Sequence, residues 1–209
     1  MARVAYVTES ELAEEDRPLL FPGTSIVPQV SPVENFEGNR PANLYRALAN
    51  SPEALRHWSV FGRWLPRGCK VPARLRELAI LQVGYLTRTP YQWSHHIKGG
   101  LDAGLSVADI ESLIAANAGQ AHGLSDAETL VLQAAREITV DRRMSEETWA
   151  KLLVHVGVAR LIDLTVIISH CNAVARVLGT LLIDVEPEFQ PYLDKFPLPP
   201  KRGVGYGND

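Results

Sequence analysis

The stretch from Leu75 to Gly104 constrains this chain most, because its apolar pattern and turn signals fit two consecutive helices. A first helix is predicted over about residues 72–87, where apolar side chains fall on every side of the helical repeat, a pattern typical of a buried helix. Glu77 lies within this helix, and a buried carboxylate needs a partner or takes up a proton. Its candidate partners are Arg74, on the same helix, and a histidine of the second helix.

The second helix is predicted to begin at Thr89-Pro90, with Thr89 as the N-cap and Gln92 completing a capping box. Gln92 and His96 share one face of this helix because they are four residues apart. His95 points about 100° away from that face. The start of the helix therefore carries a dense cluster of polar and aromatic groups, namely Tyr91, Gln92, Trp93, Ser94, His95 and His96.

The composition argues against several classes of protein. With 46% apolar and 22% charged residues, the 209-residue chain is ordinary for a globular protein, and its net charge of −3 provides no electrostatic basis for binding nucleic acid or an anionic membrane. Cys69 and Cys171 are isolated, which argues against a disulfide framework, a CxxC redox pair or a zinc site. The N-terminus lacks a secretory h-region and no run of 18 apolar residues occurs. We therefore expect a cytoplasmic protein without a membrane span.

The chain is predicted to have three parts. Residues 1–39 are expected to form an extended arm, which lies on its own domain or on a neighbouring subunit because it contains Leu19, Leu20, Phe21, Ile26 and Val27. Residues 40–185 are expected to form one helical domain. Residues 186–209 are rich in proline and glycine; we expect 189–200 to dock through aromatic side chains and the last seven residues to be disordered.

Cap and breaker residues divide the central part into helices, and no convincing strand pattern is present. Besides the central hairpin, helices are predicted over residues 43–48, from Pro52 to Pro66-Arg67-Gly68, over 107–117 after Ser106, from Ser125 to about Thr139, from Ser145 to about Gly157, and over 158–183.

Three motifs resemble those of the carboxymuconolactone decarboxylase family, whose fold is shared with alkylhydroperoxidase D-like proteins. They are RELAIL at 76–81, YQWSHH at 91–96 and LDAGLS at 101–106, and the resemblance extends over about residues 40–185. It implies an all-α, alkylhydroperoxidase D-like helical bundle that assembles into trimers or hexamers.

The sequence departs from the peroxidase branch of this family, which carries a glutamate, a CxxC pair and a histidine four residues after the second cysteine. Glu77 matches the glutamate and His96 the histidine, but Thr89 and Gln92 occupy the cysteine positions. Without a thiolate there is no nucleophile to attack a peroxide and no disulfide to form. The remaining Glu/His pair resembles the decarboxylase branch, which acts in the catabolism of aromatic compounds without a metal or organic cofactor.

Decarboxylation requires a group that holds the substrate anion, stabilisation of the charge that CO2 leaves behind, and a proton delivered to carbon. His96 is the acid–base candidate because histidine ordinarily titrates near neutral pH. Glu77 either orients the His96 ring or acts as the base itself if burial raises its pKa. Other groups are expected to donate hydrogen bonds to the substrate or to wall a small apolar pocket. These expected substrate-binding residues are Tyr91, Gln92, Trp93, His95, Trp64, His170 and Asn172.

Each assignment has a structural alternative. Glu77 can be only an ion-pair anchor and His96 only a satisfied core histidine. His95 is expected to face elsewhere because it adjoins His96, and aromatic residues such as Trp93 commonly serve packing or an interface. The two adjacent histidines diverge and no HxxxH spacing occurs, so no metal site is predicted.

We therefore favour a cofactor-independent lyase or isomerase of the carboxymuconolactone decarboxylase type that acts on a small carboxylate or lactone. The alternative is a non-catalytic, oligomeric small-molecule-binding protein of the same fold; a peroxidase is least favoured because the CxxC pair is absent. Apolar arms at both ends favour a homo-oligomer. The substrate stays open, and with it the choice among decarboxylation, isomerisation, ring opening and hydration.

Overall fold

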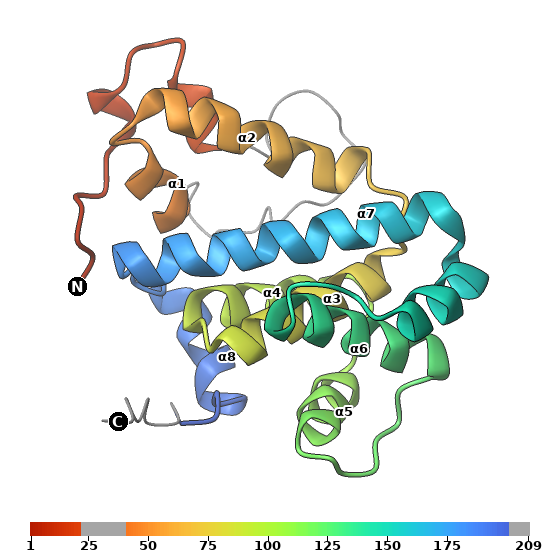
Figure 1. Ribbon diagram of the computed structural model, residues 1–209. Helices are drawn as coiled ribbons and strands as arrows, with labels where there is room; N and C mark the ends of the chain where they lie inside the picture. The colour runs from red at the N-terminus through yellow and green to blue at the C-terminus, as the bar shows by residue number, and fades with distance from the viewer. Residues whose placement is uncertain (22–40, 201–209) are drawn as a thin grey trace, which may run out of the picture.

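The computed structural model describes residues 1–21 and 41–200, and within these ranges it contains only helices and irregular segments (Figure 1). The prediction of an all-α fold is confirmed. The α-helices are α1 (Asn43–Leu48), α2 (Pro52–Arg67), α3 (Ala73–Thr87), α4 (Pro90–Asp102), α5 (Val107–Asn117), α6 (Asp126–Val140), α7 (Glu146–Leu181) and α8 (Gln190–Lys195). Short 3-10 helices occur at η1 (Glu9–Glu11), η2 (Arg17–Leu20) and η3 (Pro187–Phe189).

α3 lies in the core of the fold, as its apolar pattern predicted. It packs against α4, α6 and α7, and every residue from Glu77 to Gly84 is buried. Figure 1 shows α7 crossing the molecule, with α3, α4 and α6 on one side and α2 on the other. The buried side of α7 contributes Leu161, Leu164 and Ile167 to the same core. The α3–α4 hairpin is therefore held from several sides, which fixes the side chains that it carries.

α3 and α4 approach each other closely at Gly84. A Cβ atom at this position would lie 3.3 Å from the backbone nitrogen of Trp93 and 3.4 Å from its Cα. Because these are backbone atoms of a buried helix, a larger residue fits only if the two helices move apart. Gly84 thus allows the spacing that the hairpin has.

Gly84→Ala is expected to lower the free energy of unfolding by about 1–3 kcal/mol, because overpacking forces the helices apart. Gly179→Ala is the matched control, since a Cβ at this glycine of α7 would meet no atom within 4 Å. There alanine should raise the free energy of unfolding by about 0.5–1 kcal/mol. Urea unfolding of both variants measures the difference, and equal effects would contradict the close-approach argument.

α7 is broken at Gly157, where φ is 76° and ψ is 162°. This conformation is accessible to glycine and disfavoured for residues with a Cβ atom. The predicted division of this region at Gly157 is therefore confirmed. The second part of α7 ends at Leu181, followed by Leu182 in the left-handed conformation, so it is slightly shorter than predicted.

α7 also bears on the expected absence of a membrane span. It is long enough, and over one 18-residue window apolar enough (mean hydropathy 1.9), to cross a membrane by length and composition alone. The expectation from the sequence required an unbroken run of 18 apolar residues, whereas the mean hydropathy of an 18-residue window can be high even when a few of its residues are polar. Only 28% of the window is buried within the described part of the chain, but core helices of soluble proteins pass the same test, so the finding is weak evidence for a membrane.

Serine capping boxes begin α5 and α6, at the two positions, Ser106 and Ser125, where helices were predicted to start. The hydroxyls of Ser106 and Ser125 accept the backbone N–H of Asp109 and Glu128, whose carboxylates in turn accept the serine N–H. Arg74 joins both starts to α3, with Nη2 2.7 Å from Asp109 Oδ1 and Nε 2.6 Å from Glu128 Oε1. Arg74 is therefore engaged with α5 and α6.

The capping box predicted for α4 is wrong. Thr89 is the N-cap residue and Pro90 the first helical residue, as expected, but the Thr89 side chain caps no backbone N–H of α4. Its hydroxyl lies 2.9 Å from the Thr87 hydroxyl instead. The contact between the two threonine hydroxyls across the α3–α4 turn thus replaces the local cap. The side chains of Thr89 and Gln92 accept no hydrogen bond from the backbone N–H groups at the start of α4.

The described part of the N-terminal arm packs on its own chain. Leu20 is buried in one cluster with Leu55 of α2, and the Arg3 N–H donates to the Leu181 carbonyl at the end of α7. Within residues 1–21, the arm therefore covers α1, α2 and the end of α7 instead of extending into solvent.

The C-terminal segment docks on the helical domain through aromatic residues. Phe189 and Phe196 are both buried, and α8 packs against α4. The predicted docking of residues 189–200 is therefore present in the structure. The predictions for Ile26 and Val27 and for residues 201–209 lie outside the described residues.

Candidate acid–base site

The side chains of Glu77 and His96 meet between α3 and α4. Glu77 Oε2 lies 2.8 Å from His96 Nδ1, so the predicted contact between the buried acid and an imidazole of the next helix is present. Gly99, one turn after His96, leaves room for the carboxylate, since a Cβ there would lie 3.4 Å from Glu77 Oε2. The hairpin thus brings together two residues that are 19 apart in the sequence.

Glu77 is held in its charged form. Burial raises the pKa of Glu77, but the His96 imidazole and the Arg76 guanidinium outweigh burial, and the pKa lies below its ordinary value. The condition under which Glu77 itself would act as the base, a pKa raised by burial, is therefore not met. A carboxylate only accepts hydrogen bonds, so His96 Nδ1 carries the proton in this contact. His96 Nε2 is then the nitrogen left for chemistry.

Arg76 is a site residue that sequence reasoning missed. Its Nε lies 3.3 Å from Glu77 Oε1, and its side chain is 18% exposed, against 8% for Glu77 and 24% for His96. The buried carboxylate therefore has a cation and an imidazole on its more exposed side. Of the two candidate partners of Glu77, the histidine of the second helix is present at the carboxylate, whereas Arg74 pairs with the two helix starts instead. The place of Arg76 next to Glu77 in the RELAIL motif was the signal that could have found it.

His95 forms a second pair that is separate from Glu77. Its Nε2 lies 2.8 Å from Glu186 Oε2, and both side chains are buried. The imidazole is stacked between the rings of Tyr91 and Phe189, with centroids 4.1 and 3.6 Å away. Burial lowers the pKa of His95, so the neutral ring donates Nε2–H to the carboxylate. The alternative in which His95 faces away from the acid–base pair fits this geometry.

Glu186 is the hub of this second cluster. It also accepts hydrogen bonds from the Tyr91 hydroxyl at 3.0 Å and from the backbone N–H of Asn43 at 2.7 Å. We call these four residues, His95, Tyr91, Asn43 and Glu186, the Glu186 network. The network joins α1, α4 and the C-terminal segment, and a role of Tyr91 or His95 in substrate binding stays a prediction.

Trp93, Gln92 and Trp64 were expected to contact substrate. Trp93 is fully buried and its Nε1–H donates to the Phe196 carbonyl at 2.7 Å, so it packs between α4 and the C-terminal segment, and its expected role in the wall of a small apolar pocket stays a prediction. Gln92 is 3% exposed, and its Oε1 has no hydrogen-bond partner among the described residues. Trp64 is partly buried and tilted against Phe61, with centroids 5.2 Å apart. Substrate contact by Gln92 and Trp64 stays a prediction.

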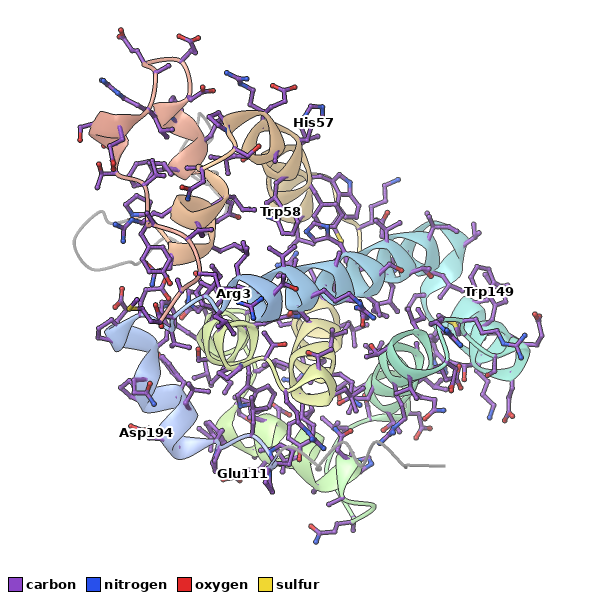
Figure 2. All side chains as sticks on the ribbon, turned by 60° about the vertical axis from the view of Figure 1, so that its left-hand side comes forward. Arg3, His57, Trp58, Glu111, Trp149 and Asp194 are labelled. Carbon is purple, nitrogen blue, oxygen red and sulfur yellow. The ribbon has the colours of Figure 1, made fainter. Side chains whose placement is uncertain are left out.

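His170 joins α7 to α2. Its ring stacks on Phe61 at 3.5 Å and lies 5.1 Å from the Trp58 ring. Figure 2 shows Trp58 on the side of α2 that faces α7, whereas His57 projects away from it. Burial lowers the pKa of His170 to about 4, so the ring is neutral at neutral pH. In this structure His170 serves as an aromatic contact between the two helices.

A cavity of about 450 Å³ lies beside the α3–α4 turn, between α3, α6 and α7. Its polar lining residues are Thr87, Thr89, Thr139, Asn172 and Arg176. Its apolar lining residues are Leu86, Val140 and Ala175. Asn172 was predicted to contact substrate and lines this cavity, whereas neither Glu77 nor His96 does. The structure therefore separates the acid–base pair from this cavity.

Cys69 and Cys171 are free thiols. Burial raises the pKa of both, and the charge of Glu77 raises the pKa of Cys171 further. Both side chains are therefore protonated at neutral pH, the opposite of what a thiolate nucleophile needs. Within residues 1–21 and 41–200, no three His, Cys, Asp or Glu side chains are grouped so as to hold a metal ion.

Comparisons with known proteins agree with the helical hairpin and its motifs. The model of the carboxymuconolactone decarboxylase family matches residues 52–137, the region from α2 into α6. No curated protein matches the chain.

One solved structure similar to this chain is that of the debrominase Bmp8, in a variant crystallised in complex with 2,3,4-tribromopyrrole. Its TM-score is 0.70 over 93% of this chain and 99% of that chain, with 16% sequence identity. At this identity the likeness concerns the fold alone. Residues 52–137, which hold both Glu77 and His96, thus match the model of the carboxymuconolactone decarboxylase family, and the all-α fold is similar to that of Bmp8.

Proposed function

We propose that this protein is a cofactor-independent lyase or isomerase that uses Glu77 and His96 to transfer protons on a small carboxylate or lactone. The observation that carries the proposal is the 2.8 Å contact between His96 Nδ1 and a buried, charged Glu77, with the His96 side chain still 24% exposed. A carboxylate on one ring nitrogen fixes the tautomer and stabilises the imidazolium, which leaves Nε2 to exchange protons with a substrate.

For a decarboxylation, the carbon–carbon bond to the carboxylate breaks and CO2 leaves. The electron pair of that bond stays on the substrate as a conjugated anion, and Nε2–H of protonated His96 then donates its proton to carbon. Glu77 stabilises the imidazolium before this transfer. His96 regains a proton from solvent, to which its side chain is partly exposed. Isomerisation, ring opening and hydration of a lactone use the same proton transfers.

Arg76 is the group that we assign to the substrate anion. It adjoins Glu77 in the chain and in space, and its guanidinium offers the forked donors that suit a carboxylate. The Arg76 charge also supports the charged form of Glu77. A substrate carboxylate held there lies on the exposed side of the acid–base pair. As in the decarboxylase branch that the sequence resembles, this reaction needs no metal or organic cofactor.

A non-catalytic small-molecule-binding protein is the second candidate. The observation that favours it is the position of the cavity, which Asn172 lines but Glu77 and His96 do not. A screen of small lactones and of β-keto and carboxy acids separates the two, using wild type, Glu77→Gln and His96→Ala. An enzyme loses turnover in both variants while staying folded, whereas a binding protein shows no turnover to lose and keeps its ligand.

We also propose that the protein is a homo-oligomer, a trimer or hexamer, in the cytoplasm. Support comes from α7, where Val158, Ile162 and Val166 are 62%, 50% and 42% exposed. Their spacing of four residues forms an apolar stripe along one side of the helix. We assign this stripe to a second copy of the chain, because two such stripes can pack along each other.

Ile162→Glu is expected to lower the mass of the oligomer to a smaller multiple of the 23.1 kDa chain, because it places a charge in the middle of the stripe. Arg160→Glu is the control, since Arg160 is exposed on the same helix but points away from the stripe. Light scattering after size-exclusion chromatography gives both masses. A monomeric wild type, or equal masses of wild type and Ile162→Glu, would rule out this interface.

A further inference from the structure

We propose that the cavity beside the α3–α4 turn is a binding site for a small organic carboxylate, with Arg176 as its counter-charge. The cavity volume of about 450 Å³ is within the range of small-molecule pockets, roughly 300–1,000 Å³. Because neither Glu77 nor His96 lines it, the site is distinct from the acid–base pair, and the inference does not depend on the proposed reaction.

Arg176 is held in position while its charge is left without an acidic partner. Its Nη1 donates to the backbone carbonyl of Asn172 at 2.6 Å and to Asn172 Oδ1 at 3.3 Å. No carboxylate pairs with it among the described residues, and no lining residue of the cavity is acidic. The remaining guanidinium N–H groups are therefore available to a ligand carboxylate, which they bind in a forked geometry.

The hydrogen bond between Asn172 and Thr139 leaves the Thr139 hydroxyl as a donor on the cavity side. Asn172 is 8% exposed, and its Nδ2 donates to Thr139 Oγ1 and to the Ile168 carbonyl, each at 3.0 Å. Because Thr139 Oγ1 accepts this hydrogen bond, its own O–H is directed elsewhere, and the described residues provide no acceptor for it. Thr139 can therefore donate a hydrogen bond to the same anion as Arg176.

The α3–α4 turn contributes a further favourable field. Thr89 lines the cavity and is the N-cap residue of α4, but its side chain caps no backbone N–H. The N-terminal end of a helix carries a partial positive charge, which favours an anion nearby. Arg88 and Asp141 are sequence neighbours of lining residues and carry opposite charges, so Arg176 determines the sign of the site.

The apolar lining indicates an organic ligand. Leu86, Val140 and Ala175 form the hydrophobic part of the wall, and an inorganic anion would fill only a small part of a cavity of this volume. Apolar wall and convergent donors together suit a carboxylate that carries a short chain or a single ring. Phosphate alone would leave the apolar surface in contact with water.

Calorimetric titration of the full chain tests this inference with benzoate and hexanoate as carboxylates, benzamide as the uncharged analogue, and inorganic phosphate. Benzoate should bind at least about tenfold more tightly than benzamide or phosphate. Arg176→Gln should lower the affinity for benzoate at least about tenfold and leave the affinity for benzamide unchanged. Arg160→Gln, an exposed arginine on the same helix, is the matched control and should bind as wild type does.

Two further variants locate the site and guard against misfolding. Thr139→Val preserves the side-chain shape and should weaken benzoate several-fold, which keeps the test valid if Arg176→Gln fails to fold. Glu77→Gln and His96→Ala should bind benzoate as wild type does, even if the proposed reaction is wrong. The inference is overturned if neither carboxylate binds at about 10 mM, if phosphate binds as tightly as benzoate, or if affinity depends on Glu77 or His96 and not on Arg176.

Discussion

His96→Ala is expected to lower kcat about 10²- to 10⁴-fold on any small carboxylate or lactone that the wild type converts, because it removes the group that exchanges protons with the substrate. Glu77→Gln should lower kcat as well, since an amide cannot stabilise the positive charge of the imidazolium. Initial rates across the substrate panel, together with thermal unfolding of each variant, provide the measurement.

The matched control for His96 is His57→Ala. His57 is 77% exposed on α2, and its removal should leave kcat within about twofold of wild type. Added imidazole should restore part of the activity of His96→Ala but none of that of Glu77→Gln. If His96 had only a structural role, added imidazole would restore no activity. Full activity of folded His96→Ala would end the catalytic proposal and leave the binding-protein alternative.

The largest expected effect on stability comes from Glu186→Ala. Its removal leaves His95, the Tyr91 hydroxyl and the Asn43 N–H without their buried acceptor. Breaking a buried pair by removing one partner costs about 3–5 kcal/mol in the free energy of unfolding. Glu188→Ala, an exposed glutamate two residues on, should change the free energy by no more than about 0.5 kcal/mol. Urea unfolding followed by circular dichroism measures both variants.

The pH dependence of unfolding is a second readout of the Glu186 network. Burial lowers the pKa of His95, so below its ordinary value of about 6.5 the unfolded chain binds a proton that the folded chain does not. The contribution of His95 to the free energy of unfolding is therefore fully present above about pH 6.5 and is lost as the pH falls. His170, with a pKa of about 4, acts in the same direction. Burial raises the pKa of Glu186, but the hydrogen bonds from His95 and Asn43 outweigh burial and hold this pKa below its ordinary value. The contribution of Glu186 to stability is therefore also lost as the pH falls.

His95→Gln distinguishes the contribution of His95 from the others. Glutamine can still donate to Glu186 but does not titrate, so the loss of stability between pH 7 and pH 5 should be smaller than in wild type. His170 accounts for the part of the slope that remains. An unchanged pH dependence in His95→Gln, or a loss below about 1 kcal/mol in Glu186→Ala, would contradict the stabilising role of the network.

Helix positions were largely predictable from the sequence because their signals are local. Ser106 and Ser125 begin helices through hydrogen bonds to residues three positions away, and Gly157 breaks α7 through its own backbone conformation. The cap at Thr89 was wrong for the opposite reason, since its hydroxyl is engaged by Thr87 across a turn. A local signal fails where a competing partner comes from another element.

The contact between Glu77 and His96 was predictable because a short turn between two antiparallel helices leaves few possible arrangements of their buried faces. Arg76 and Arg74 were not distinguishable in the same way. Both are near Glu77 in sequence, and only the packing of α5 and α6 directs Arg74 to Asp109 and Glu128. The Glu186 partner of His95, 91 residues away, had no signal in the sequence.

The sequence by itself determined an all-α fold and narrowed the partners of a buried carboxylate to an arginine of its own helix or an imidazole of the next, because periodicity, caps and a short turn act over a few residues. The tertiary structure decided which charges pair over long distances, which predicted site residues are buried in the core, and where a cavity opens. These depend on how α6, α7 and the C-terminal segment pack around α3 and α4, and such contacts leave no pattern in the residues on either side of them.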